Sequence, residues 1–236
     1  MRNRLFRNVN PAIIIILVVM LGNRLTAGMS ISEWIYDTLV SLPGIIIALT
    51  FHEAAHGYAS YWLGDPTPKL QGRLSLNPTH HIDPVGFITL LLFGFGWGEP
   101  VQIDPRYYKH RRRDELLVSV AGVIMNLLLA VAASFAIKAL LSNMTAEFYN
   151  GIGSVLLDIL VYLFGINLVL MAFNLLPVPP LDGFGILTQI FNLQKYNWYW
   201  TYYRNGFAVL MLLILFDITD MIIRPISGFF YDLLLF

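Results

Sequence analysis

Two histidines and a glutamate form the pattern in this chain with the most specific chemistry. Residues 51–57 read Phe-His-Glu-Ala-Ala-His-Gly, which places His52 and His56 four positions apart. On a helix, residues four apart share one face, so both imidazoles can point at one metal ion. Glu53 projects from the same turn and can accept a proton from a metal-activated water. Imidazole suits zinc, so the pattern predicts one Zn2+ per chain.

The alternative is a pair of helical histidines bonded only to their neighbours. The apolar surroundings favour the metal, because ionisable groups at membrane depth are costly and usually functional. Of the 236 residues, 57% are hydrophobic and only 13% are charged. Soluble domains carry about 25% charged residues, so the composition indicates a membrane protein in contact with the lipid bilayer. The formal net charge is zero, which gives no indication of a nucleic-acid partner.

The absence of cysteine excludes disulfides and thiolate ligands, so any metal ligand must be His, Asp or Glu. A zinc site that hydrolyses its substrate needs three protein ligands and an open position for water. Asp182 is the best remaining candidate, because it follows a helix that ends in a proline-rich segment, Pro177 to Pro180, and precedes a glycine. The alternative is an ordinary helix end whose aspartate faces the cytoplasm.

Hydropathy predicts an all-α polytopic membrane fold of five or six transmembrane helices. The expected spans are 11–28, 39–63, 115–141, 154–176 and 206–222. Residues 85–98 are apolar but short and interrupted by glycines, which favours a re-entrant segment. Residues 70–77 alternate between apolar and polar, so we expect a small β-hairpin between the second and third core spans. Residues 224–236 fit either an interfacial helix or a further half-span.

We treat residues 1–236 as one membrane-embedded domain, with a catalytic core at about 39–183 and flanking helices at 11–28 and 206–222. With a cytoplasmic N-terminus and a re-entrant 85–98, most Lys and Arg residues fall on the inner side, as the positive-inside rule requires. This topology makes the chain a multi-pass protein of the cell membrane with its site nearer the cytoplasmic face. In this topology the second and fourth spans both run from the outer to the inner side of the membrane, so His52, His56 and Asp182 can converge at a similar depth.

The motifs together resemble the site-2 proteases, the intramembrane zinc metalloproteases. The resemblance covers residues 49–183 and includes His-Glu-x-x-His, the stretches GRLSLNPTHHIDPVG and FGWGEPVQIDPR, and Asn174 followed by Pro and Leu-Asp-Gly. It implies that His52, His56 and Asp182 bind zinc and that Glu53 is the catalytic base. The chain is similar to the minimal, single-module form, without a PDZ or nucleotide-sensing domain.

The resemblance also gives roles to three other residues. Asn174 corresponds to an asparagine that holds the substrate backbone or the developing oxyanion, and Gly122 and Asn126 correspond to a helix-packing motif. From its apolar context alone, Asn126 either bonds a neighbouring helix or faces the cleft. His80 and His81 fit a hydrogen-bonded turn better than a metal site.

The implied function is hydrolysis of peptide bonds in membrane-spanning proteins or peptides. The alternative is a zinc-binding membrane protein or metal carrier that does not cleave, although such a protein has no need of Glu53. The sequence does not identify the substrate or the oligomeric state. Asp158, Asp217 and Asp220 have no evident partner in the sequence.

Overall fold

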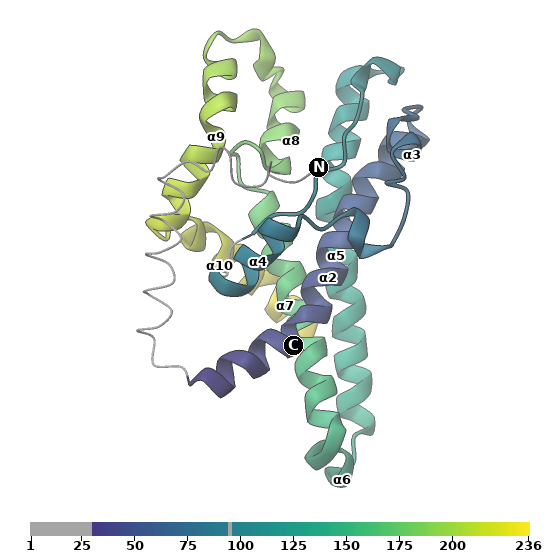
Figure 1. Ribbon diagram of the computed structural model, residues 1–236, viewed down its shortest axis with the longest axis vertical. Helices are drawn as coiled ribbons and strands as arrows, with labels where there is room; N and C mark the ends of the chain where they lie inside the picture. The colour runs from purple at the N-terminus through teal and green to yellow at the C-terminus, as the bar shows by residue number, and fades with distance from the viewer. Residues whose placement is uncertain (1–29, 94–95) are drawn as a thin grey trace, which may run out of the picture.

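A computed structural model describes residues 30–93 and 96–236, and in these ranges the chain is helical (Figure 1). Three helical units are long and apolar enough to cross a membrane: α2 (Ile31–Trp62), α5 (Arg111–Asn143), and α6 (Ala146–Phe148) continued through η3 (Tyr149–Gly153) into α7 (Ser154–Asn174). The remaining elements are α3 (Thr67–Leu70), η1 (Pro78–His80), α4 (Pro84–Phe93), η2 (Pro105–Tyr107), α8 (Asp182–Phe191), η4 (Leu193–Lys195), α9 (Trp198–Leu215) and α10 (Ile218–Leu235).

Helix α2 carries the two histidines and has well-defined signals at both ends. It begins with a capping box, in which the Ser30 hydroxyl accepts from the Glu33 N–H and the Glu33 carboxylate accepts from the Ser30 N–H. It ends at Trp62, and Gly64, two residues later, has a φ of +107°, a conformation that favours glycine. The helix is therefore long enough to carry His52 and His56 far inside the helical bundle.

The core lies between α5 and α7, which run side by side (Figure 1), and α2 packs against both. The buried residues of this core are apolar side chains of α5 and α7, with α10 packed over them: Val123, Ala130, Ala133, Ile137, Phe164, Leu168 and Met171. Small residues on α5 let α7 approach closely, as is common where helices meet in a membrane. The packing of α2, α5 and α7 against one another therefore fixes the position of α2 relative to α5.

Helices α2 and α7 also touch directly at two places. A Cβ atom on Gly44 of α2 would lie 3.0 Å from the Leu163 Cα of α7, so glycine is needed there for the backbones to meet. Nearer the N-terminus of both helices, the Tyr36 hydroxyl donates to Asp158 Oδ2 at 2.5 Å. Asp158 thus has a partner that its position in the sequence did not reveal.

Residues 82–93, which include α4, and residues 96–98 lie so that the second stretch meets the start of the first. Ile82 and Gly98 form an isolated antiparallel bridge, which holds the two ends of the segment together. A Cβ atom on Gly86 would lie 2.2 Å from the Trp97 carbonyl oxygen, so the returning chain lies directly on α4. The described part of this segment therefore doubles back on itself, and its re-entry into a membrane stays a prediction.

The predicted β-hairpin at residues 70–77 is wrong. Leu70 ends α3, and the described part of the chain contains no strand beyond that isolated bridge. The alternating pattern does not form a strand here, because it does not bury one face of the segment against the core. The side chains of Leu70 and Leu76 are 82% and 53% exposed. The Ser75 carbonyl, which a ladder would have used, instead bonds His81 Nε2 at 2.7 Å.

The expected count of five or six spans is not supported. The described residues provide three candidate spans, or four if α9 and α10 together form one, and the predicted span at 11–28 lies outside them. The predicted span at 206–222 is not one straight helix, because α9 ends at Leu215 and α10 continues at a bend of 78°. Asp217, with a φ of 54°, breaks the helix at this bend. Residues 224–235 belong to α10, which packs on α7.

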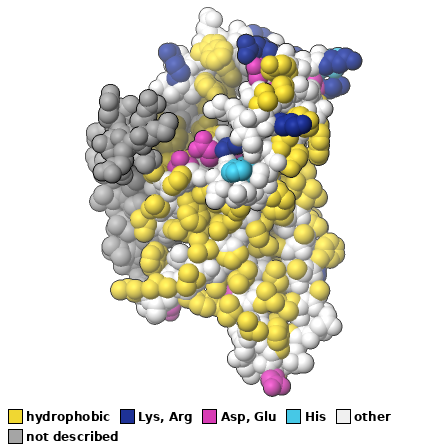
Figure 2. All heavy atoms as spheres, turned by 45° about the vertical axis from the view of Figure 1, so that its right-hand side comes forward, with side chains coloured by type: hydrophobic (Ala, Val, Ile, Leu, Met, Phe, Trp, Pro, Cys, Tyr) yellow, Lys and Arg dark blue, Asp and Glu magenta, His cyan; other side chains and the backbone are white. Residues whose placement is uncertain are grey.

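Charged and apolar side chains separate along the length of the molecule. Figure 2 shows Lys and Arg gathered towards one end, whereas hydrophobic side chains cover most of the visible face below them. The basic residues near this end lie where α2 stops and α5 starts, and include Lys69, Arg106, Lys109, Arg111, Arg112 and Arg113. An apolar belt beside a basic end is the pattern expected of a membrane protein.

The contact at Gly44 gives a stability prediction. We expect Gly44→Leu to lower the free energy of unfolding by about 1–3 kcal/mol, because the new side chain meets the backbone of α7, which cannot move aside. Gly165→Leu is the control, because a Cβ atom at this position on α7 would meet nothing within 4 Å. It should change the free energy of unfolding by less than about 0.5 kcal/mol. Unfolding in detergent measures both, and equal effects would contradict the packing.

Candidate metal centre

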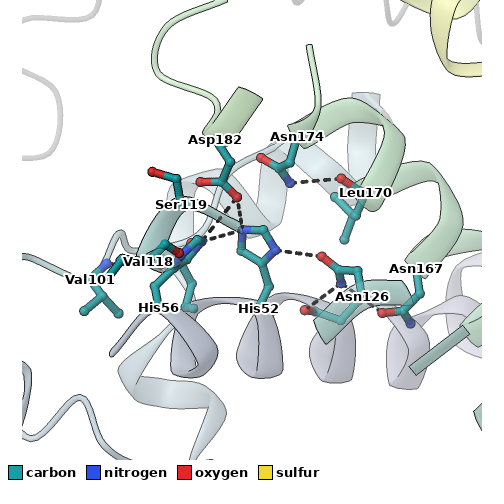
Figure 3. A network of polar contacts seen from close by, with 12 residues as sticks. His52, His56, Val101, Val118, Ser119, Asn126, Asn167, Leu170, Asn174 and Asp182 are labelled. Carbon is teal, nitrogen blue, oxygen red and sulfur yellow. Dashed lines mark hydrogen bonds and ion pairs between the residues drawn. The ribbon is translucent and has the colours of Figure 1, made fainter. Parts of the chain in front are cut away.

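Three potential metal ligands from two distant parts of the chain meet in the bundle (Figure 3). His52 and His56 lie on α2, and Asp182 is the first residue of α8. The two Nε2 atoms are 3.1 Å apart, and Asp182 Oδ2 lies 3.4 Å from His52 Nε2 and 3.3 Å from His56 Nε2. This is the one group of three or more such residues found among the described residues.

The end of α7 and the position of α8 bring Asp182 to the histidines. After α7 ends at Asn174, the chain turns so tightly that a Cβ on Gly183 would lie 2.3 Å from the Leu175 carbonyl oxygen. Glycine is therefore required directly after Asp182. At the other end of α8, the Arg112 guanidinium donates to the Gln189 carbonyl at 2.6 Å, which ties α8 to α5.

Hydrogen bonds at the opposite ring nitrogens set the direction of both imidazoles. His52 Nδ1 bonds Asn126 Oδ1 at 2.6 Å, and His56 Nδ1 bonds the Val118 carbonyl at 2.7 Å. Both partners are acceptors, so each Nδ1 carries the proton and donates it. In the neutral imidazole, which is the form that binds a metal, each Nε2 then has a free lone pair that faces Asp182.

A buried chain of amides fixes the acceptor for His52. The Asn126 Nδ2 group donates to Asn167 Oδ1 at 2.9 Å and to the Ala48 carbonyl at 3.3 Å, so the Asn126 oxygen must face His52. Asn167 in turn donates to the Leu163 carbonyl at 2.8 Å. Asn126 thus bonds two neighbouring helices. Asn167 was not among the residues predicted from the sequence, although an amide in an apolar helix seven residues before Asn174 was a usable signal.

The donor set fits a zinc ion. Two lone pairs and a carboxylate face one another within 3.4 Å, and Asp182 Oδ2 is buried and accepts no hydrogen bond. Such electron-rich atoms repel one another unless a cation lies between them. Ligand atoms about 2.0–2.1 Å from a tetrahedral zinc ion stand about 3.3 Å apart, which is close to the spacing here.

Gly122 of α5 leaves room for the two rings. A Cβ atom there would lie 2.4 Å from His56 Nε2 and 2.5 Å from His52 Cε1. The backbone of α5 therefore covers the imidazole pair directly, and any larger residue would push the rings aside. Gly122 and Asn126, one turn apart, face the histidines from the same side of α5.

Glu53 and Asn174 lie near the ligand group without belonging to it. Glu53 Oε2 accepts from the Val101 N–H at 3.0 Å, three residues after the bridge at Gly98. Asn174 Nδ2 donates to the Leu170 carbonyl at 3.0 Å, and its side chain lies beside Asp182 in Figure 3. His81 is buried and bonded to the Ser75 carbonyl, and neither His80 nor His81 joins the ligand group.

The position of Gly122 predicts a metal-binding defect. We expect Gly122→Ala to weaken zinc binding at least about tenfold, because its methyl group would displace both imidazoles. Gly165→Ala is the control, since it lies on a helix of the same bundle with open space around it. Metal titration of purified protein measures both affinities, and an unchanged affinity in Gly122→Ala would exclude this arrangement of the rings.

Comparison with known proteins identifies the family of the chain. A family model described as Peptidase family M50 matches residues 41–215. The chain is 41% identical over 165 residues to "Putative zinc metalloprotease YwhC" of Bacillus subtilis, covering 67% of this chain and 74% of that protein. It is 27% identical over 183 residues to "Putative zinc metalloprotease Rip2" of Mycolicibacterium smegmatis, covering 75% and 67%. No solved structure matches the chain.

The family match covers more than half of the chain, and it includes His52, His56 and Asp182. The apolar helices and the family together indicate a multi-pass membrane protein. The chain belongs to Peptidase family M50, the site-2 protease family of zinc metalloproteases.

Proposed function

We propose that this protein is an intramembrane zinc endopeptidase that cleaves membrane-spanning proteins or peptides. The convergence of His52, His56 and Asp182 carries the proposal, because their three facing atoms leave a space that suits one Zn2+. Zinc bound there supplies a Lewis acid and lowers the pKa of a coordinated water to about 7. The chain must then supply a base, a place for the substrate backbone and a path for water.

Glu53 is the base in this proposal. It lies one turn before His56 on α2, and its carboxylate is held through Oε2 by the Val101 N–H, which leaves Oε1 available to a water molecule. The carboxylate accepts the proton of the attacking water and passes it to the leaving amine. A site that only stores or carries zinc has no use for a carboxylate at this position.

The substrate must present an unwound peptide bond, since the amides of a helix are already hydrogen-bonded. Residues 97–101 belong to no helix and lie beside Glu53, where an unwound segment of the substrate would add by backbone hydrogen bonds. Asn174, beside Asp182, would hold the freed substrate backbone or the developing oxyanion with its amide (Figure 3). This role requires Asn174 to exchange its bond to the Leu170 carbonyl for one to the substrate.

The basic end of the molecule supports a site nearer the cytoplasm. Lys and Arg gather where α2 stops and α5 starts, and cytoplasmic segments of membrane proteins carry an excess of these residues (Figure 2). His52 and His56 lie in the half of α2 nearer this end. We therefore place this end in the cytoplasm, with one catalytic domain spanning the described helices. A cytoplasmic N-terminus stays a prediction, because it depends on the expected span at 11–28, which lies outside the described residues.

Glu53→Gln tests the proposal most directly. The variant should retain zinc and cleave a membrane-embedded peptide about 10²–10⁴-fold more slowly, because it keeps the shape of Glu53 but cannot take up a proton. Glu147→Gln, an exposed glutamate in α6, is the control and should cleave normally. Zinc content and cleavage in proteoliposomes are measured on the same preparations. Cleavage at the wild-type rate by Glu53→Gln would contradict the proposed base.

A further inference from the structure

A second buried polar cluster lies where α2 ends, outside the candidate metal centre. Asp65 follows the helix and is 0% exposed, as is Ser60. The Asp65 carboxylate accepts from the Ser60 hydroxyl at 2.8 Å, from the Thr67 N–H at 2.9 Å and from the Asp104 N–H at 2.8 Å. Ser60 also bonds the Tyr108 hydroxyl at 2.8 Å.

This carboxylate is held by neutral donors. None of the ion pairs formed by the described residues includes Asp65, so hydrogen bonds alone offset the cost of burying it. Burial acts to raise the pKa of Asp65, but the hydrogen bonds from Thr67, Asp104 and Ser60 together hold that pKa below its ordinary value. Asp65 therefore stays charged at neutral pH, and its contribution to stability is lost only as the pH falls below the ordinary range of an aspartate.

The bond to Asp104 connects this cluster to the proposed base. Asp104 lies three residues after Val101, whose N–H donates to Glu53 Oε2 at 3.0 Å. The segment from Val101 to Tyr108 is otherwise irregular, apart from the three-residue turn η2. Three hydrogen bonds thus attach this segment to the end of α2: one to Glu53, one just beyond the helix to Asp65, and one from the Tyr108 hydroxyl to Ser60.

We propose that Asp65 is a positioning residue, which anchors the segment from Val101 to Tyr108 and thereby sets the Val101 N–H against the Glu53 carboxylate. With the anchor in place, Glu53 is restricted to one orientation, with Oε1 directed away from the Val101 N–H. Without it, the segment and the carboxylate move together and the base is misplaced. The metal ligands do not depend on this anchor, because no hydrogen bond joins Asp65 to His52, His56 or Asp182.

Asp65→Asn tests the anchor with little change of shape. Its NH2 group must face at least one of the N–H or O–H donors that now bond the carboxylate. We expect kcat to fall about tenfold or more while KM changes less than about twofold, and we expect the zinc content to match the wild type. Asp104→Asn is the control, because the contribution of Asp104 to the anchor is its backbone N–H and its side chain bonds Arg106.

A distance measurement tests the anchor without proteolysis. The chain has no cysteine, so spin labels can be attached solely at Gln71→Cys and Gln102→Cys. These exposed side chains now bond each other at 3.2 Å, across the two segments that Asp65 joins. Electron spin resonance should give one narrow distance distribution in the labelled wild type and in Asp104→Asn, and a broad one in Asp65→Asn.

The inference rests on the proposed function, and the two fail in different ways. Absence of zinc or of cleavage in the wild type would overturn the function, whereas the spin-label result would still report whether Asp65 anchors the segment. An unchanged distance distribution in Asp65→Asn would overturn the anchor. A broadened distribution with wild-type kcat would overturn its role in positioning Glu53, as would an equal loss of kcat in Asp104→Asn.

Discussion

The mutual repulsion of three electron-rich atoms is the constraint on which this structure depends. Two imidazole lone pairs and a carboxylate oxygen face one another at 3.1–3.4 Å inside an apolar bundle. No hydrogen bond offsets the burial of Asp182 Oδ2. Other contacts in the fold must hold these atoms together. Each of the three central helices, α2, α5 and α7, contributes at least one such contact. A cation bound between the three atoms would remove this repulsion, and its binding would stabilise the folded protein.

Helix α5 supplies most of these contacts. Its Val118 carbonyl and Asn126 side chain accept from the two histidines, and Gly122 between them lets the backbone lie against both rings. Asn167 of α7 fixes the orientation of Asn126 through a buried amide bond. The direction of His52 is therefore determined by residues on two other helices. Partners of this kind also raise the basicity of a metal-binding imidazole.

The spacing of His52 and His56 was sufficient to predict that their imidazoles share one face of a helix, because the geometry of a single helix decides it. The convergence of Asp182 with His52 and His56 was predicted from the topology, in which the second and fourth spans run in the same direction. Asn167 was missed because its partner lies 41 residues away on another helix. The β-hairpin at 70–77 failed for a similar reason, since alternation of polar and apolar residues cannot supply the neighbouring strand. The break at Asp217 was missed because a short polar interruption does not change mean hydropathy much.

Metal content of detergent-purified protein, compared between wild type and Asp182→Ala, tests the central claim most directly. We expect about one zinc per wild-type chain and a strongly reduced content in the variant, because two imidazoles alone leave the ion without its carboxylate. Asp232→Ala, at an exposed aspartate in α10, should keep the wild-type content. Zinc retained unchanged by Asp182→Ala would contradict a site shared between α2 and α8, and no zinc in any of the proteins after reconstitution would contradict the metal centre itself.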